Sequence, residues 1–266
     1  MIIKLNLFKR DIFLMTTLRI NRKKLILSFE ERYFEPVSNP HTEALTIYYQ
    51  APNFSQKHRT MEFKTSHIDL TKSEDRLLKD IAKNTRYQIN RFFKKDKLDC
   101  QIIVNPDNEE IKNFASFYNI FAESKGLCKC NTQKIKRLAE KNAIVFSVVQ
   151  NSNMNPMCYH AYIVNGIRAR QLHSASKYRD INDKNEQNLI ARANRGLHWF
   201  DMKYFKSEGY NIFDIGGLAN LDVHPEMLNI NKFKKDFGGK EVIEYNIYCP
   251  NSILARIALY YFLRNS

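Results

Sequence analysis

Tyr210-Asn-Ile-Phe-Asp-Ile-Gly-Gly-Leu218 is the stretch around which the rest of the chain can be arranged. Its alternating apolar residues predict a strand from Asn211 to Ile215. Gly216-Gly217 follows at once, and glycines at a strand end let a ligand or another segment of chain approach the backbone closely. Asp214 stands just before this opening. Taken alone, the glycine pair fits an ordinary turn at a sheet end better than a binding site.

A second glycine pair ends the run Ile230-Asn-Lys-Phe-Lys-Lys-Asp-Phe-Gly-Gly239. Phe233 and Phe237 stand at helical spacing, so the lysines between them face other directions. Gly238-Gly239 ends this helical turn before a strand at residues 242–248. The sequence therefore predicts a lysine-rich helical turn between two strands.

The elements before this region alternate between strands and helices. Three early strands, bounded by prolines, precede a helix whose start carries a capping-box pattern at Thr71-Lys-Ser-Glu74. Asn165-Gly166 predicts a hairpin turn inside a later antiparallel meander. The expected strands cover residues 25–34, 44–50, 61–70, 101–104, 143–149, 157–164 and 168–174, and the expected helices cover 74–95, 107–126, 133–141, 185–207 and 253–263.

This order predicts an α+β fold with a mixed, mainly antiparallel central sheet flanked by helices and an N-terminal partial sheet. Residues 1–24 are expected to form an N-terminal appendage, with Met1 and Met15 both candidate starts and no export signal. Residues 25–266 are expected to form a single domain. Within it we expect N-terminal strands at 25–70, a core at 71–248 and a C-terminal helix at 250–264.

The charge of the chain favours anionic partners. Lysine and arginine number 42 against 28 acidic residues, which gives a net charge of +14. Five cysteines without paired spacing predict neither disulfides nor a zinc site, so no metal is expected and a reducing cytoplasm fits best. The apolar run at the C-terminus is shorter than the ~20 residues of a membrane span, and predicts a helix that docks on the protein or lies on a membrane surface.

Several segments together resemble the GNAT acyltransferase fold, and more specifically its FemAB-like branch, which builds peptide cross-bridges by aminoacyl transfer. The likeness covers roughly residues 61–248 and is carried by residues 73–95 with Asn84-Thr-Arg-Tyr87, by 169–179, 197–199, 213–217 and 232–239. It implies that an amine attacks an activated acyl group on coenzyme A, an acyl carrier protein or an aminoacyl-tRNA. Two features depart from the family: residues 176–187 lack the glycine-containing pyrophosphate loop of coenzyme-A-binding members, and the chain holds one GNAT-like unit instead of two.

The resemblance also implies catalytic roles. Lys234 is the expected oxyanion stabiliser, with Lys232 as the alternative if the register differs. His160 is a candidate general base because histidine titrates near neutral pH, and His173 competes with it. Asp214 is a candidate for orienting the acceptor amine. A hydrogen-bonded core histidine and a solvated lysine remain open interpretations of His160 and Lys234.

Further residues are expected to bind the substrates. Arginine forms bidentate contacts with carboxylate or phosphate, which makes basic side chains candidates for holding anionic substrates. The expected substrate-binding residues are Arg86, Tyr87, Arg91, Tyr162, His173, Ser174 and Ser176, and the expected donor-binding residues are Arg179 and Arg192.

The predicted function is N-acyl transfer from an activated donor to an amine of a cell-envelope or polysaccharide precursor, through direct attack without a covalent enzyme intermediate. We expect no permanently bound cofactor, because the acyl donor is a co-substrate. The expected partners are this phosphate-bearing donor, including tRNA or an acyl carrier protein, and an anionic envelope precursor or nucleotide amino sugar. The expected location is the cytoplasm or the inner face of the membrane. The alternative is a non-enzymatic module that binds nucleic acid through the basic face of the helix at 74–95.

Overall fold

The structure is a computed structural model that describes residues 17–24, 26–38, 41–179 and 181–264. The side chains of Arg179, Glu226 and residues 262–264 lie outside this description. The two candidate start residues and the expected role of the Arg179 side chain therefore lie outside the described residues.

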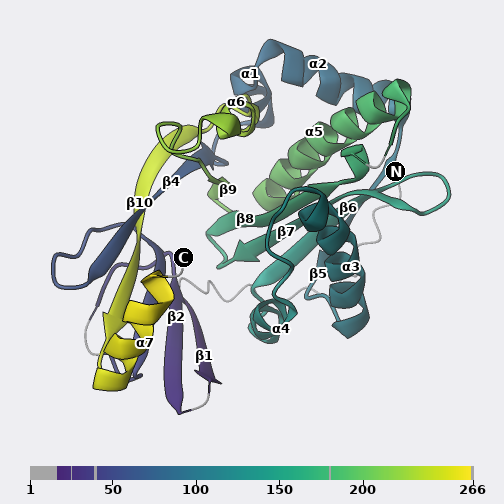
Figure 1. Cartoon of the computed structure of the whole chain (residues 1–266). Coiled ribbons are helices and arrows are strands. Elements are labelled where there is room, and N and C mark those ends of the chain that lie inside the picture. The colour runs from purple at the N-terminus through teal and green to yellow at the C-terminus, as the bar shows by residue number, and fades with distance from the viewer. Residues whose placement is uncertain (1–16, 25, 39–40, 180, 265–266) are drawn as a thin grey trace.

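One sheet of ten strands forms the centre of the described chain (Figure 1). The strands lie in the order β1-β2-β3-β10-β4-β9-β8-β7-β6-β5. Two neighbouring pairs are parallel, β2 with β3 and β8 with β9, and the other described pairs are antiparallel. In sheet order the strands are β1 Leu18–Lys24, β2 Leu27–Tyr33, β3 Leu45–Ala51, β10 Lys240–Pro250, β4 Arg59–Asp69, β9 Ile212–Gly217, β8 Arg168–Ser176, β7 Pro156–Val164, β6 Ile144–Gln150 and β5 Asp99–Val104. The predicted mixed, mainly antiparallel sheet flanked by helices is confirmed.

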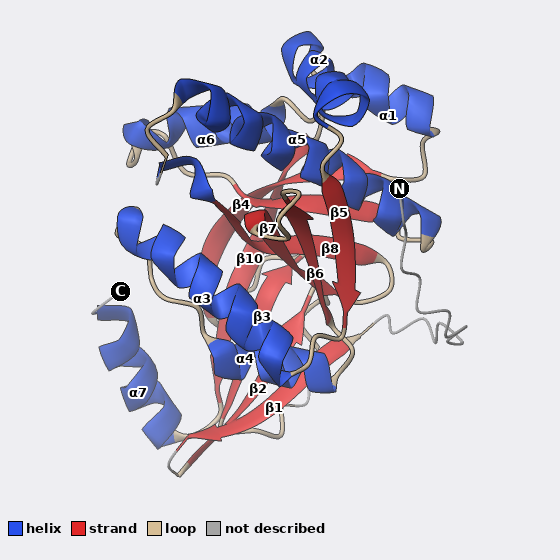
Figure 2. Ribbon diagram, turned by 90° about the vertical axis from the view of Figure 1, so that its right-hand side faces the viewer, coloured by secondary structure: helices blue, strands red, loops and turns tan. Residues whose placement is uncertain are grey.

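Helices cover the sheet in separate groups. Figure 2 shows α1 (Glu74–Asp80), α2 (Lys83–Arg91), α5 (Lys184–Ser207) and α6 (Leu228–Lys235) together, apart from the remaining helices. Buried apolar residues of α1, α2 and α5 pack with those of β4, β7 and β9 in one cluster, and the partly buried Phe233 of α6 packs against it. The other helices are α3 Asn108–Ser124, α4 Thr132–Glu140 and α7 Ile253–Arg264; short turns of π- or 3₁₀-helix cover Phe92–Asp96, Lys177–Arg179 and Pro225–Met227.

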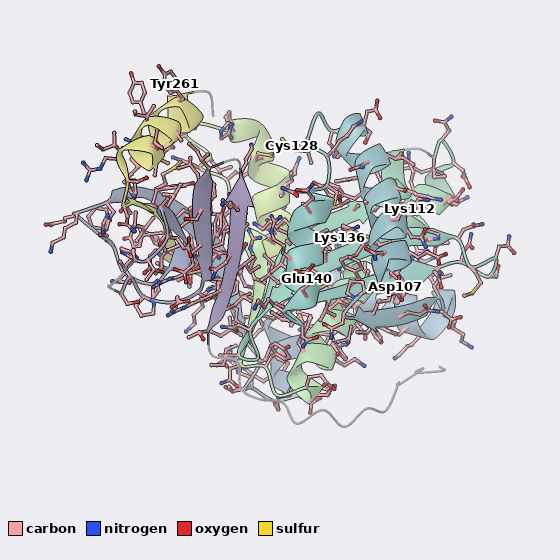
Figure 3. The ribbon with its side chains drawn as sticks, turned by 90° about the horizontal axis from the view of Figure 1, so that it is seen from below. Asp107, Lys112, Cys128, Lys136, Glu140 and Tyr261 are labelled. Atoms are coloured by element: carbon pink, nitrogen blue, oxygen red, sulfur yellow. The ribbon has the colours of Figure 1, made fainter. Side chains whose placement is uncertain are left out.

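The N-terminal strands share a core with α3 and α4. Leu18, Ile20 and Tyr33 pack in one buried cluster with Ile135 and Leu138 of α4. Figure 3 shows α4, which carries Lys136 and Glu140, between the first two strands and α3. Residues 18–24, expected in an appendage, instead pair with β2 along their whole length. The N-terminal strands β1 and β2 thus pack against α4 through this cluster.

The expected helix at 74–95 is interrupted. Ile81 is buried with an extended backbone, ψ 136°, so α1 ends there and α2 begins two residues later. The Ala82 amide donates to the carbonyl of Asp236, a contact distant in sequence. The start also differs from the expected capping box: the Ser73 hydroxyl caps α1 by accepting from the Arg76 amide, whereas Thr71 bonds to Asp69. A tertiary contact, invisible to local periodicity, therefore breaks the helix.

Gly238 fixes the end of α6 against the end of α1. Its φ is +80°, and a Cβ placed on it would lie 2.6 Å from the carbonyl oxygen of Asp80. Only glycine combines this conformation with so close an approach of two backbones.

We predict that Gly238→Ala destabilises the protein more than Gly209→Ala does. Gly209 has a similar φ of +83° but open space around the position of a Cβ, so it measures the conformational cost alone. Forcing an atom into packed backbone costs about 1–3 kcal/mol in addition. Urea unfolding of the two variants checks this, and equal free energies of unfolding would contradict it.

Candidate functional site

The candidate site lies where β8 and β9 part. The two strands pair in parallel over three residue pairs, from Arg168 with Ile212 to Arg170 with Asp214. Beyond these pairs β8 continues along β7 and β9 continues along β4, so an opening forms between their carboxyl ends. Gly216, with φ +88°, borders this opening, and a Cβ there would lie 3.1 Å from the carbonyl oxygen of Gln171. The close approach of another segment of chain that was predicted at this glycine pair is therefore present.

Lys234 reaches into the opening from α6. Its ammonium group donates a hydrogen bond to the carbonyl of Gly217. The helix is held in place by Asn231, whose side-chain amide bonds the backbone of Ala219 in both directions, at 3.0 and 2.8 Å. Lys232, the alternative expected from the sequence, is exposed. The geometry thus selects Lys234 as the lysine of this opening.

The electrostatic surroundings weaken the hold of Lys234 on its proton. Burial and, to a smaller extent, the cation of Arg170 lower its pKa to about 8, although the carboxylate of Asp214 acts in the opposite direction. A lysine with this pKa is still mainly protonated at neutral pH. It can therefore donate a charged hydrogen bond in a site from which much of the water is excluded.

Asp214 belongs to a buried network of charges. Arg168 bridges it to Glu244 of β10, with guanidinium to Glu244 distances of 2.7 and 2.8 Å. The Asp214 carboxylate also accepts from Gln50 at 3.1 Å and from Thr65. Although burial opposes ionisation, the pKa of Asp214 falls to about 2, chiefly because of Arg168 and Arg170. The carboxylate is fully buried, so the expected contact with an acceptor amine is replaced by a structural role that ties β9 to β8, β10 and β3.

Arg170, two residues along β8 from Arg168, gives the opening a second cation. The Nε atom of its guanidinium has no hydrogen-bond partner among the described residues, and the group lies 5.6 Å from the ring centroid of Phe63. Its charge contributes to lowering the pKa of Lys134, Lys234 and His173. Arg170 is therefore placed to meet an anionic group.

Lys134 of α4 supplies a third cation. Burial lowers its pKa to about 8, and its ammonium lies 4.6 Å from the ring centroid of Tyr49. Its counter-charge is Glu31, which also accepts from the Tyr33 hydroxyl at 2.7 Å and pairs with Arg22. Neither Lys134 nor Arg170 was predicted from the sequence as a site residue, because the importance of each depends on which strands face it.

His160 lies in the core and not in the opening. Its Nδ1 is 2.8 Å from an Asp201 oxygen and its Nε2 is 2.8 Å from the side-chain oxygen of Asn194. The same Asp201 oxygen accepts from the Tyr162 hydroxyl at 2.6 Å. With no exposed surface and both ring nitrogens engaged, His160 matches the alternative of a hydrogen-bonded core histidine. Neither His160 nor Tyr162 is placed to touch a substrate.

One sequence signal could have revealed this core network. Asp201 lies four residues after Leu197 and four before Phe205, on the buried stripe of α5. A carboxylate at such a position requires buried hydrogen-bond partners. Its partners, His160 and Tyr162, lie two residues apart on β7, and strand alternation puts them on one face of that strand.

A cavity of about 210 Å³ opens at the end of β8, between α3, α5 and α6. Its lining combines apolar rings with polar and cationic groups: Phe121, Lys125, Ser176, Tyr178, Ala191, Asn194, Arg195 and Phe233. Asn194 joins this lining to His160, and Phe233 is the neighbour of Lys234 in the chain. Of the expected substrate-binding residues, Ser176 is thus placed in a cavity beside the opening.

The other expected binding residues have different surroundings. Arg86 donates to the carbonyls of Leu78 and Lys79 at 3.1 and 3.0 Å, so it closes the end of α1 instead of facing an anion. Arg192 pairs with Asp96 at 2.7 and 3.0 Å and is not free for a donor. Tyr87 and Arg91 are exposed on α2. The basic face expected to bind nucleic acid is accordingly divided between two helices, with one arginine already engaged.

His173 and Ser174 lie on β8 and are partly buried. The His173 ring is 4.2 Å from that of Tyr118, measured between centroids. Burial, together with the cations of Arg170 and Lys134, lowers the pKa of His173 to about 4. His173 is therefore a neutral imidazole at neutral pH.

Among the residues that the structure describes, three groups of side chains have ligand atoms close enough together for a metal ion. They are His41, His58 and Cys249; His160, His198 and Asp201; and His67, Asp214 and Glu244. In the third group the guanidinium of Arg168 already bridges the two carboxylates. In the second, His160 and Asp201 bond to each other.

Comparison with known proteins rests on structure. No protein-family model matches the chain, and no curated protein matches it by sequence. FemX superposes on it with a TM-score of 0.60 at 13% sequence identity, over 86% of this chain and 83% of FemX. The chain has the fold of FemX.

Two further structures show the same likeness. The C-terminal domain of a putative lysylphosphatidylglycerol synthetase from Agrobacterium fabrum gives a TM-score of 0.55 at 13% identity, over 91% of this chain and 84% of that domain. L-PGS from Bacillus licheniformis superposes with a TM-score of 0.54 at 14% identity, over 91% of this chain and 84% of L-PGS. The FemAB-like, GNAT-type resemblance predicted from the sequence is confirmed at the level of the fold.

We predict that Asp214→Asn destabilises the protein at neutral pH and progressively less in acid. The folded-state pKa of about 2 lies below the unfolded value of about 3.9, so the stabilising contribution is complete above pH ~4 and is lost as the pH falls towards 2. This linkage amounts to about 2 kcal/mol. Unfolding by urea across this pH range measures it, with the exposed Asp222→Asn as control. A stability deficit of Asp214→Asn that does not change with pH would contradict the prediction.

Proposed function

We propose that this protein is an acyltransferase that forms an amide, by moving an acyl or aminoacyl group from an activated donor to an amine of a cell-envelope or polysaccharide precursor. The observation that carries the proposal is the partly buried ammonium of Lys234 at the point where β8 and β9 part. In the reaction the amine nitrogen attacks the acyl carbonyl carbon and the carbonyl oxygen becomes an oxyanion. The bond to the thiol sulfur or ribose oxygen of the donor then breaks; the amine loses a proton and the leaving group gains one.

Lys234 fits the role of oxyanion stabiliser. It now donates to the carbonyl of Gly217, so an oxygen that enters the opening beside Gly216 could replace that acceptor. A preorganised cation in a partly dry site stabilises a developing negative charge more than it would in water. The low pKa of about 8 also means that the proton is weakly held and strongly donated.

The cavity at the end of β8 fits the activated end of the donor. Lys125 and Arg195 add positive charge to its lining, as a phosphate-bearing donor requires. The nearby N-terminus of α5 is less suited to a pyrophosphate, because the carboxylate of Asp183 already caps it by accepting from the Asn185 amide. We therefore favour a donor carried on an acyl carrier protein or a tRNA over free acyl-coenzyme A.

The acceptor is proposed to be an anion held by Arg170 and Lys134. Arg170 interacts electrostatically with Tyr33 and Lys134 with Glu31, both on β2, whereas the proposed donor cavity is lined by residues of α3, α5, α6 and the end of β8. A carboxylate or phosphate on the acceptor would bring its amine towards Lys234. The five cysteines are free, which agrees with the cytoplasmic location that we propose for the reaction.

A panel of labelled donors tests the proposal. The purified protein would be incubated with acetyl-coenzyme A, an acyl carrier protein thioester or aminoacyl-tRNA, each with amine acceptors drawn from envelope precursors. Transfer of label to an amide supports the proposal and identifies the donor. The absence of both transfer and binding with every donor would exclude this class of activity.

We predict that Lys234→Ala lowers kcat by about 10²–10³ with little change in KM, because a charge that acts on the oxyanion contributes mainly in the transition state. Lys232→Ala, an exposed lysine on the same helix, serves as the matched control and should retain the wild-type rate. Since the protonated lysine is required, the wild-type rate should fall as the pH rises above about 8. Equal rates for the two variants would remove Lys234 from the mechanism.

Arg170→Ala should change two kinetic properties together. The KM for an anionic acceptor rises, because a partner of its charged group is lost. The alkaline fall in rate moves to higher pH, because removing a neighbouring cation raises the pKa of Lys234. Arg170→Lys keeps the positive charge, so its pH profile should resemble that of the wild type. Its KM for the anionic acceptor should stay raised, since an ammonium lacks the bidentate geometry of a guanidinium. An unchanged profile in Arg170→Ala would contradict the coupling.

A further inference from the structure

The outer face of α7 is apolar and exposed. Ile253 is 77% exposed, Leu254 53%, Ile257 49%, Tyr260 62% and Tyr261 61%. Figure 3 shows Tyr261 on the outer side of this helix, at the margin of the molecule. Neighbouring exposed apolar residues of this kind usually mark a surface that binds something.

The opposite face of α7 is already used. Ala255 is fully buried in a cluster with Leu45 and Ile47 of β3, against which Leu27 and Phe29 of β2 also pack. The helix is therefore anchored on the N-terminal strands through one side. The exposed side chains of α7 lie on the face of the helix that points away from the sheet.

The turn between β1 and β2 extends the same surface. Ile26 in this turn is 75% exposed, and it precedes Leu27, which packs near Ala255. Figures 1 and 2 show the ends of β1 and β2 that adjoin Ile26 at the same end of the molecule as the start of α7. Lys23 and Lys24, which end β1, are exposed as well.

The charges around these apolar residues are mainly positive. Arg256 of α7 is exposed, and residues 253–264 contain no aspartate or glutamate. Lys23 and Lys24 add two more cations, whereas Glu43, whose carbonyl accepts from the Asn251 side chain, adds one anion. Apolar and tyrosine side chains surrounded by lysine and arginine match the interface of an anionic lipid bilayer.

We propose that this surface, formed by Ile26, Lys23, Lys24 and the exposed residues of α7, docks the protein on an anionic membrane. The proposed contact is a peripheral one. Within the described chain no helix combines the length and the apolar character of a membrane span. Anionic lipids attract the three cations, and the apolar side chains enter the boundary between headgroups and acyl chains. A second copy of the chain fits less well, because a twofold contact through this surface would bring identical cations together.

Vesicle sedimentation tests the proposal without any acyl donor or acceptor, so its outcome is independent of the proposed transfer reaction. The full-length protein would be mixed with sucrose-loaded vesicles of phosphatidylcholine alone or of an equimolar mixture with phosphatidylglycerol. We expect the protein to sediment with the anionic vesicles, with at least about tenfold weaker binding to the neutral ones and weaker binding at high salt.

Two double variants locate the contact. Ile253→Asp with Ile257→Asp, and separately Lys23→Glu with Lys24→Glu, should each lower binding to anionic vesicles by about tenfold or more. Ile120→Asp with Met154→Asp changes residues of similar exposure, 59% and 58%, on other parts of the surface and should bind like the wild type. Circular dichroism and thermal unfolding confirm that each variant is folded.

Three results would overturn the proposal. The first is a wild-type protein that stays in the supernatant with both kinds of vesicle. The second is equal loss of binding in the control variant, which would place the contact elsewhere. The third is a wild-type dimer in solution that the α7 variant converts to a monomer, since the surface would then belong to a second copy of the chain.

Discussion

The guanidinium of Arg168 between Asp214 and Glu244 is the interaction on which the rest of the site depends. Its partners come from β9 and β10, and Gln50 of β3 bonds to both carboxylates. An ion pair this deeply buried adds little net stability over an apolar packing of the same shape, but removing one partner is costly. Its effect is therefore to specify which strands meet, and at which register, in the middle of the sheet. The opening beside Gly216 begins just beyond Asp214, the last residue of β9 that pairs with β8.

The site gathers cations around buried carboxylates, among them Asp214, Glu244 and Glu31. Asp214 stays ionised under Arg168 and Arg170, and the pKa values of Lys234 and Lys134 fall because water is excluded around them. The two lysines thus combine two properties that conflict in water: they carry a charge near neutral pH and they hold their protons weakly. Such groups are typical of sites where charge develops during a reaction.

Local patterns in the sequence predicted most of the elements but not the contacts between them. The hairpin at Asn165-Gly166, the helix after Asp107 and the strand before Gly216 follow from turn chemistry, capping and alternation, which act over a few residues. The break at Ile81 could not be predicted, because its cause is the carbonyl of Asp236 far along the chain. The charges of Arg170 and Lys134 were missed for the same reason, whereas Lys234 was singled out through resemblance. Alternation along β7 puts His160 and Tyr162 on one face of that strand. The carboxylate of Asp201 on the apolar stripe of α5 is a signal that could have been used to find their partner.

The position of β10 has a consequence for how the molecule is made. This strand lies between β3 and β4, so in the described sheet it is the link between the N-terminal strands and the remainder, although it follows them by almost two hundred residues. During synthesis β3 and β4 cannot pair with β10 until that strand has left the ribosome, much later than they do. Strand pairing over such a separation in sequence is slow. Until then Gln50, Arg168 and Asp214 lack Glu244, and two unpaired strand edges are open to other chains. The newly made chain is therefore most in need of a chaperone just before its last strand is inserted.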